Sequence, residues 1–362
     1  MIHIQQLNKT GLLQYIQSAA FAESPVIAIS RHRAISHIHN PRAHDDDVLM
    51  FIAYDNDVMV GYLGALPDDL YDDAGHKHHF AWMSCLWIDP EQRGKKIAQK
   101  LVQDCFTAWN HRIILTEYTE PAARLYQKLN LFDNAGALQG RRWYLRSDLY
   151  HILPPKKTIF EKLKPIFKVA DMIINFFGDL KNIGKRFPKI KDIDQINEET
   201  DQLIQLYANS TAFRRQSDIL NWAMQYPWIE EGKASNESRR YHFSSVSRQF
   251  VNKLYAITDE SGSMCGCMLV NIRDGHMKIP FLYCSQIDIN TINSIVQVIE
   301  KYKVNTLSLY NDALIRYLKN NKTLRAPSKK IDRKYLIGRL FNQEQGFQNI
   351  TFSAGDGDTP FT

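Results

Sequence analysis

The chain has 362 residues, of which 44% are hydrophobic and 23% are charged, and its formal net charge is +6. This length suits two domains, and this composition is that of an ordinary globular protein, not of a disordered or fibrous one. No apolar run reaches the ~18 residues of a membrane span. The first residues lack a signal-peptide pattern, and five cysteines without metal-site spacing predict reduced thiols in a cytoplasmic protein.

The positive charge is concentrated in one segment. Ten basic and three acidic residues lie between Pro154 and Lys191, so the remainder of the chain carries a net charge of −1. Such local basicity argues against a nucleic-acid partner. An apolar stripe at helical spacing predicts an amphipathic helical region over 151–191. We favour a linker helix packed between two domains; the alternative is a helix on an anionic membrane surface.

The first part of the chain alternates between strand and helix patterns. Residues 1–7 predict a strand and residues 12–20 a helix, and residues 48–54 and 58–66 predict a hairpin of two strands. Residues 68–79 are mostly polar and predict an exposed loop.

Histidines gather in two parts of this region. His44 belongs to a polar segment over 24–47, and His76, His78 and His79 lie close together further along the chain. Histidine serves proteins as a metal ligand and as a general base. The spacing within 24–47 matches no standard metal site, so we predict a substrate-facing loop or plain surface there. His76, His78 and His79 could bind a metal or act as a base, but we expect an exposed connection, and no metal is expected in the protein.

The next stretch predicts a buried strand, a tight turn and the start of a helix. Residues 82–88 form an apolar run, Pro90 ends it, and Gly94 gives the backbone freedom to turn. From Ile97 onward, apolar residues recur at helical spacing.

Three basic residues, Arg93, Lys95 and Lys96, lie at this predicted helix start. The N–H groups of a first helical turn have no intrahelical partners, and together with the helix dipole they attract anions. Basic side chains add to this attraction. The turn is therefore a candidate phosphate-binding site, and the alternative is a plain surface connection.

A second helix follows this site. Residues 112–116 predict a short strand and residues 120–129 a helix in which Pro121 suits the first turn, and residues 142–145 predict a closing strand.

The half after Lys191 repeats this layout in outline, which indicates a divergent internal duplication. The repeated elements are a strand–turn–strand at 254–269, a strand at 278–284, a helix at 292–302, a strand at 306–310 and a helix at 311–320. The basic turn has no counterpart in this half. Three aromatic residues of this half either line an acceptor groove or, as we expect, pack in the core: Trp222, Tyr226 and Trp228.

Two motifs together resemble the GNAT superfamily of acyl-CoA-dependent N-acetyltransferases over residues 1–150. They are LWIDPEQRGKKIA at 86–98 and EPAARLYQKLNLF at 120–132. Arg93 and Ala98 fit the family's loop pattern, Arg/Gln-x-x-Gly-x-Gly/Ala, but Lys96 takes the place of the central glycine. The family's second motif usually begins with Asn, where this chain has Glu120.

The resemblance implies that acetyl-CoA is the co-substrate. Its pantetheine arm would pair with the backbone at 86–88 as an added strand, and its pyrophosphate would lie on the amides of the basic turn. The implied CoA-binding residues are Leu86, Trp87, Ile88, Arg93, Gly94, Lys95, Lys96, Ile97, Ala98, Glu120, Ala123 and Tyr126.

The resemblance also implies catalytic roles. Tyr126 would protonate the departing thiolate of CoA. The family often has a glutamate on the central strand as the general base for the amine, but 82–88 contains none. Glu117, at the end of the next strand, is the first candidate for this base, and His79 is the second. Cys85 is expected to be a buried structural thiol.

These observations predict an α/β (α+β) protein with two GNAT-like domains, each a mixed, mostly antiparallel sheet flanked by helices. We expect a catalytic domain at 1–150, a basic linker at 151–191 and a degenerate domain at 192–362. The expected reaction transfers an acetyl group to an amine of a small molecule or peptide. The alternative is a catalytically inactive GNAT-fold binding or scaffold protein. The tail at 355–358 is expected to be exposed and flexible.

Overall fold

The computed structural model describes residues 2–180, 190–209, 211–321, 323–324, 326–345, 347 and 350–362. Part of the predicted basic linker, 181–189, lies outside the described residues. The chain divides into two compact units, each built from segments that are not contiguous in sequence. Unit 1 comprises Met1–Leu138, Gln195–Asn252 and Arg333–Thr362, and unit 2 comprises Gln139–Asp194 and Lys253–Asp332.

Unit 1 contains a sheet with the strand order β1-β2-β3-β4-β5-β14. Neighbouring strands are antiparallel, except that β4 and β5 run parallel. The strands are β1 (Ile2–Leu7), β2 (Met50–Asp55), β3 (Val58–Tyr71), β4 (Lys77–Ile88), β5 (Ile113–Thr116) and β14 (Ser328–Gly338), and β8 (Glu230–Glu231) pairs separately with β9 (Val246–Ser247).

Helices cover both faces of this sheet, as the alternation along β2 shows. Phe51 and Ala53 pack with α4 on one face, whereas Met50 and Ile52 pack with α1 on the other. The helices of unit 1 are α1 (Lys9–Gln17), α2 (Ala19–Glu23), α3 (Arg31–Ile38), α4 (Ile97–Ala108), α5 (Glu120–Leu129), α9 (Glu198–Ala208), α10 (Ser217–Gln225), α11 (Asn236–Arg240) and α14 (Arg339–Gln345), with short 3-10 turns at Pro90–Gln92 and Thr359–Phe361.

Unit 2 contains a sheet with the strand order β6-β13-β12-β11-β10-β7. Its strands are β6 (Phe132–Tyr144), β7 (Asp192–Ile193), β10 (Phe250–Thr258), β11 (Met264–Arg273), β12 (His276–Cys284) and β13 (Thr306–Leu309). Its helices are α6 (Leu149–Ile152), α7 (Thr158–Lys162), α8 (Lys164–Leu180), α12 (Ile289–Tyr302) and α13 (Asp312–Asn320), with a 3-10 turn at Pro154–Lys156.

The order strand, helix, parallel strand, helix occurs in both units, as β4-α4-β5-α5 and as β12-α12-β13-α13. The strand that follows each series pairs in the other unit. After α5, residues Arg141–Tyr144 of β6 pair with β13 in unit 2. After α13, residues Tyr335–Ile337 of β14 pair with β5 in unit 1. In each unit, the strand beside the shorter strand of the parallel pair therefore comes from the other half of the chain.

The prediction of an exposed loop at 68–79 is wrong. β3 continues to Tyr71 and β4 begins at Lys77, so the connection covers only the residues between them. Asp68 and Asp69 are buried in β3. The oxygens of Asp68 accept hydrogen bonds from Arg42, Arg215 and Trp82, which satisfies a charge that sequence patterns place in a loop.

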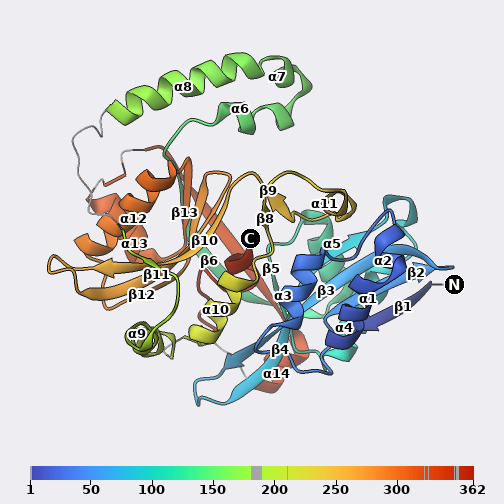
Figure 1. The fold of residues 1–362 in the computed structure, drawn as a ribbon. Helices are drawn as coiled ribbons and strands as arrows, with labels where there is room; N and C mark the ends of the chain where they lie inside the picture. The colour runs from blue at the N-terminus through green and yellow to red at the C-terminus, as the bar shows by residue number, and fades with distance from the viewer. Residues whose placement is uncertain are drawn as a thin grey trace. The chain divides into compact units, whose positions relative to one another are not determined.

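The predicted amphipathic helix is α8, which lies beside α6 within unit 2 (Figure 1). Its polar side chains make the contact, since Asp171 accepts hydrogen bonds from Ser147 and from the first amides of α6, and Asn175 bonds the backbone of Ser147. Several apolar side chains of α7 and α8 are exposed, namely Ile159, Ile166, Val169, Met172, Ile173, Ile174 and Phe176, whereas Phe160, Leu163 and Phe167 are half-buried. The packing of this segment between two domains stays a prediction.

The tail at 355–358 is also buried, contrary to the prediction. Asp356 is fully buried and accepts hydrogen bonds from the guanidinium of Arg215 and from the amide of Ser353. Phe361 packs against the rings of Trp222 and Trp228. The end of the chain is thus part of the core of unit 1.

The predicted fold class is confirmed: helices flank mixed, mostly antiparallel sheets. Among the described helices, none combines the length and the apolar character that crossing a bilayer requires. Both units mix segments of the first and second halves of the chain. The division into domains at 1–150, 151–191 and 192–362 stays a prediction.

Candidate active site

A break between β4 and β5 is the central feature of unit 1. The two strands pair through Ala81 with Ile113 and Trp82 with Ile114, and β4 then continues to Ile88 beyond this pairing. A bulge bends β4 there, because Cys85 adopts a left-handed φ of 55° and one extra residue of β4 lies opposite β3. The backbone at 86–88 therefore lies where an extended, amide-rich chain can pair with it.

The predicted phosphate turn follows β4 directly. Gly94 has a φ of 89°, and no atom lies within 4 Å of the position that a Cβ would take there. Arg93, Lys95 and Lys96 are exposed, and the first turn of α4 has neither an acidic residue nor a side-chain cap. The first amides of α4 are thus available to an anion beside three positive charges.

Lys96 shows why the family pattern has glycine at its position. The residue is left-handed, with φ 61° and ψ 16°, and it immediately precedes α4. An L-residue with a Cβ pays about 1 kcal/mol for this conformation, whereas glycine adopts it freely. The turn therefore keeps its backbone shape although its sequence departs from the pattern.

Lys96→Gly is expected to raise the free energy of unfolding by about 0.5–1 kcal/mol, because it removes this backbone strain. The measurement is the midpoint of urea denaturation. Lys95→Gly is the matched control. It removes a lysine charge at the preceding position, where φ is not positive, and is expected not to raise the free energy of unfolding. A loss of stability in Lys96→Gly would contradict the strain assigned to this residue.

Tyr126 lies on α5 with only 6% of its surface exposed. Its ring packs edge-on against Tyr118 and Phe132, with centroid distances of 5.9 and 5.2 Å. Burial raises the pKa of Tyr126, so its hydroxyl is protonated at neutral pH and has a proton to donate.

The other predicted residues near Tyr126 lie in the first turn of α5 or just before the helix. Glu120 is exposed and pairs with Arg124 at 2.5 Å, and Ala123 is half-buried. Glu117 directly follows β5, has a left-handed conformation and is half exposed. Its carboxylate lies 2.9 Å from the guanidinium of buried Arg333.

His79 lies at the opposite end of β4 from the bulge. Cys85 lies six positions further along the strand, which is roughly 20 Å of extended backbone. Burial lowers the pKa of His79, but hydrogen bonds and ion pairs with Asp47 and Asp69 raise it to about 9. An imidazolium at neutral pH has no free lone pair, which argues against the general-base prediction for His79.

No sequence pattern predicts the buried arginine that lies beside the bulge. Arg33 of α3 donates hydrogen bonds to Ser84 Oγ at 3.3 Å and to Tyr241 Oη at 3.2 Å, and its guanidinium lies 3.7 Å from the ring centroid of Trp228. Tyr241 is 208 positions away in sequence, so no motif connects the two residues. These side chains lie on the α3 face of β4, opposite the face that packs against α4 and Tyr126.

The aromatic residues expected to pack in the core do so. Trp222 and Trp228 are buried in unit 1, and their indole N–H groups donate to the carbonyl and hydroxyl oxygens of Ser36. Tyr226 stacks on His39 with the ring centroids 4.6 Å apart. These residues brace α3, which carries Arg33.

Comparison with known proteins gives a family for part of the chain. Residues 14–131 match the model of the acetyltransferase (GNAT) family. No curated protein sequence matches the chain.

Solved structures of similar fold cover nearly the whole chain. One is a conserved protein of unknown function from Enterococcus faecalis, described as a "Probable N-Acyltransferase", with a TM-score of 0.52 and 10% identity over 95% of this chain and 75% of that one. Another is a GCN5-related N-acetyltransferase from Anabaena variabilis, with a TM-score of 0.49 and 14% identity over 96% of this chain and 75% of that one. At these identities the first likeness shows the fold alone.

The matched region contains the bulged strand, the basic turn and the helix that carries Tyr126. It begins within α1 and ends between α5 and β6. Residues 14–131 of this chain therefore form a domain of the GNAT acetyltransferase family, as the spacing of the two motifs predicts.

Proposed function

We propose that unit 1 transfers an acetyl group from acetyl-CoA to an amine of a small molecule or peptide. The observation that carries this proposal is the separation of β4 from β5 at the Cys85 bulge, next to the basic first turn of α4. The backbone at 86–88, which lies beyond the pairing of β4 with β5, suits the amides of pantetheine. The amides from Arg93 to Ala98 suit the pyrophosphate.

The reaction is a single displacement in this proposal. The amine nitrogen attacks the thioester carbonyl, a C–N bond forms, and the C–S bond breaks. Tyr126 donates its hydroxyl proton to the sulfur as the thiolate leaves, which a neutral tyrosine in contact with the sulfur is able to do. The amine loses its proton to Glu117, the candidate whose half-exposed carboxylate lies at the end of β5.

The α3 face of β4 is the proposed side of the amine acceptor. Buried Arg33 and Tyr241 and half-buried Ser84 form a polar cluster there, whereas the opposite face is occupied by α4 and α5. A polar cluster held by a braced helix provides fixed hydrogen-bonding groups for a polar substrate.

Calorimetry with acetyl-CoA is expected to give one binding site per chain, and an assay for released thiol is expected to show turnover with at least one member of a panel of amines. Arg93→Ala is expected to weaken binding, because it removes a charge beside the pyrophosphate. Arg316→Ala, on α13 of unit 2, is the matched surface control with unchanged affinity. No binding at millimolar acetyl-CoA would overturn the proposal, and binding without thiol release from any amine would support the inactive binding protein.

A further inference from the structure

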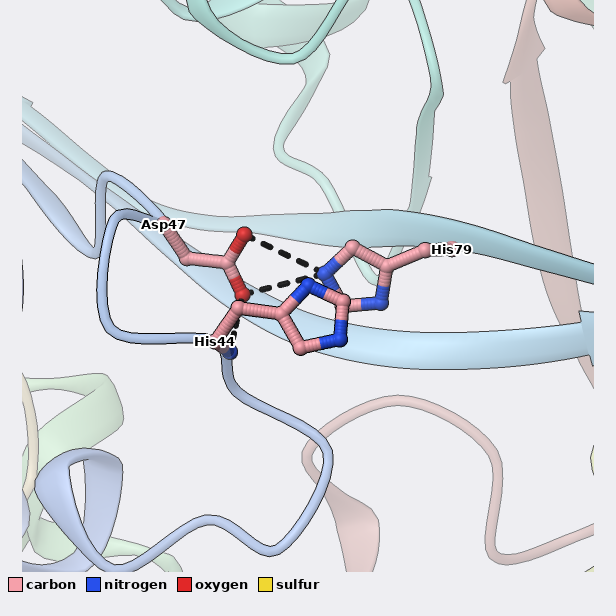
Figure 2. Close-up of side chains that lie close together, drawn as sticks. All are labelled: His44, Asp47 and His79. Atoms are coloured by element: carbon pink, nitrogen blue, oxygen red, sulfur yellow. Dashed lines mark hydrogen bonds and ion pairs between the residues drawn. The ribbon is translucent and has the colours of Figure 1, made fainter.

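Three potential metal ligands from two distant parts of the sequence meet at one end of β4. His44 and Asp47 lie on the connection that leads into β2, and His79 lies near the start of β4 (Figure 2). One ligand atom from each residue lies within 4.8 Å of the other two. The rings of His44 and His79 stack with their centroids 4.1 Å apart.

Hydrogen bonds already orient two of these side chains. His79 Nδ1 lies 3.0 Å from Asp69 Oδ1, so its other nitrogen, Nε2, points to Asp47 at 3.0 Å. The carboxylate of Asp47 also accepts the backbone N–H of His44 at 2.7 Å. A histidine whose second nitrogen bonds a carboxylate is the usual arrangement for a metal ligand, because the carboxylate fixes the ring and strengthens its basicity.

The surroundings favour a dication. Asp69 is 7% exposed, and the side chains of Asp47 and His79 are 10% and 19% exposed. Lys77 Nζ is 3.5 Å from Asp69 Oδ2, and Arg42 donates a hydrogen bond to the backbone oxygen of Asp69 at 3.2 Å. His44 is exposed, so its ring has room to turn the short distance that closes a coordination sphere.

We propose that His44, Asp47 and His79 bind a divalent transition metal ion of the zinc class, with Asp69 orienting His79. Zn²⁺ displaces the Nε2 proton of the His79 imidazolium, because only the neutral ring has a lone pair for the ion. Two imidazoles and one carboxylate then form a donor set that suits Zn²⁺, which takes a fourth ligand from water. The site lies roughly 20 Å along β4 from the Cys85 bulge. A metal there serves the fold by joining the connection before β2 to β4, because binding to the folded state alone stabilises that state.

Titration of the purified, metal-free protein with Zn²⁺ against a chromophoric chelator tests this site. We expect one ion per chain, a rise in Tm on binding, and with Co²⁺ the visible absorption of a low-symmetry site. His44→Ala is expected to weaken Zn²⁺ at least tenfold, and since His44 is exposed this variant keeps the fold. Asp69→Asn is expected to weaken Zn²⁺ by about 10–100-fold, the usual effect of losing such an orienting carboxylate.

Two other histidines serve as controls. His39→Ala removes an exposed histidine that stacks on Tyr226, and His76→Ala removes one that pairs with Asp72 together with His78. Both variants are expected to bind Zn²⁺ with unchanged affinity. Absence of stoichiometric binding, or full affinity in His44→Ala with loss in His76→Ala, would overturn the proposal. The readout is independent of acetyl transfer.

Discussion

Tyr126→Phe is expected to lower the turnover of acetyl-CoA roughly 100-fold and to leave the affinity for acetyl-CoA within a factor of about two. General acid catalysis contributes about 10²–10⁴-fold, and phenylalanine removes only the proton donor. The ring stays in place, since Tyr118 and Phe132 hold it by edge-on packing. Steady-state kinetics of thiol release, combined with calorimetry, separates the two effects.

Tyr118→Phe is the matched control for this prediction. Tyr118 is a half-buried neighbour in the same cluster, with its ring centroid 5.9 Å from that of Tyr126. Loss of its hydroxyl is expected to change turnover less than threefold. If both variants lose activity equally, or if Tyr126→Phe is fully active, Tyr126 is a packing residue and not a general acid.

Asp68→Ala is expected to lower the free energy of unfolding by about 3–5 kcal/mol, the usual cost of removing one partner from a buried ion pair. Asp68 is 3% exposed and accepts hydrogen bonds from Arg215 at 2.6 and 2.9 Å, from Arg42 at 2.5 Å and from the indole of Trp82 at 2.6 Å. Its loss leaves two buried guanidinium groups short of a counter-charge. Urea denaturation at neutral pH measures the effect.

The control for this prediction is Asp45→Ala. The side chain of Asp45 is 97% exposed and pairs with Lys9, so its removal is expected to cost less than about 0.5 kcal/mol. Burial raises the pKa of Asp68, but Arg215 and Arg42 lower it to about 2, from an ordinary value of 3.8. Because the folded-state pKa is the lower one, this stabilisation is present above pH 4 and is lost as the pH falls towards 2. Equal costs for the two variants would contradict the role given to Asp68.

Local patterns predict the parts of the fold that short-range physics controls. The helix from Glu120 to Leu129 has the predicted bounds, because a proline in the first turn and an apolar stripe determine it. The turn before α4 also follows from its sequence, since Gly94 and the position of Lys96 both require a left-handed backbone. The family and the sheet class follow from these two motifs.

Long-range contacts are what the sequence does not reveal. Asp68 belongs to a strand because Arg215, 147 positions later, neutralises it. His44 and His79 lack metal-site spacing, yet the hairpin of β3 and β4 returns His79 to the connection before β2. In both cases the two residues come close together only once the sheet has formed.

The exchange of β14 and β6 has a consequence for how the protein is made. The edge of β5 pairs with β14, and 223 positions separate Ile114 from its partner Ile337. While the ribosome is still adding the residues between them, the sheet of unit 1 exposes an open edge of unpaired N–H and C=O groups, which is the kind of edge that recruits other chains. Pairing over so long a separation is slow. Synthesis of the chain through β14 therefore precedes completion of the sheet, and until then the edge of β5 is a place where other chains can pair.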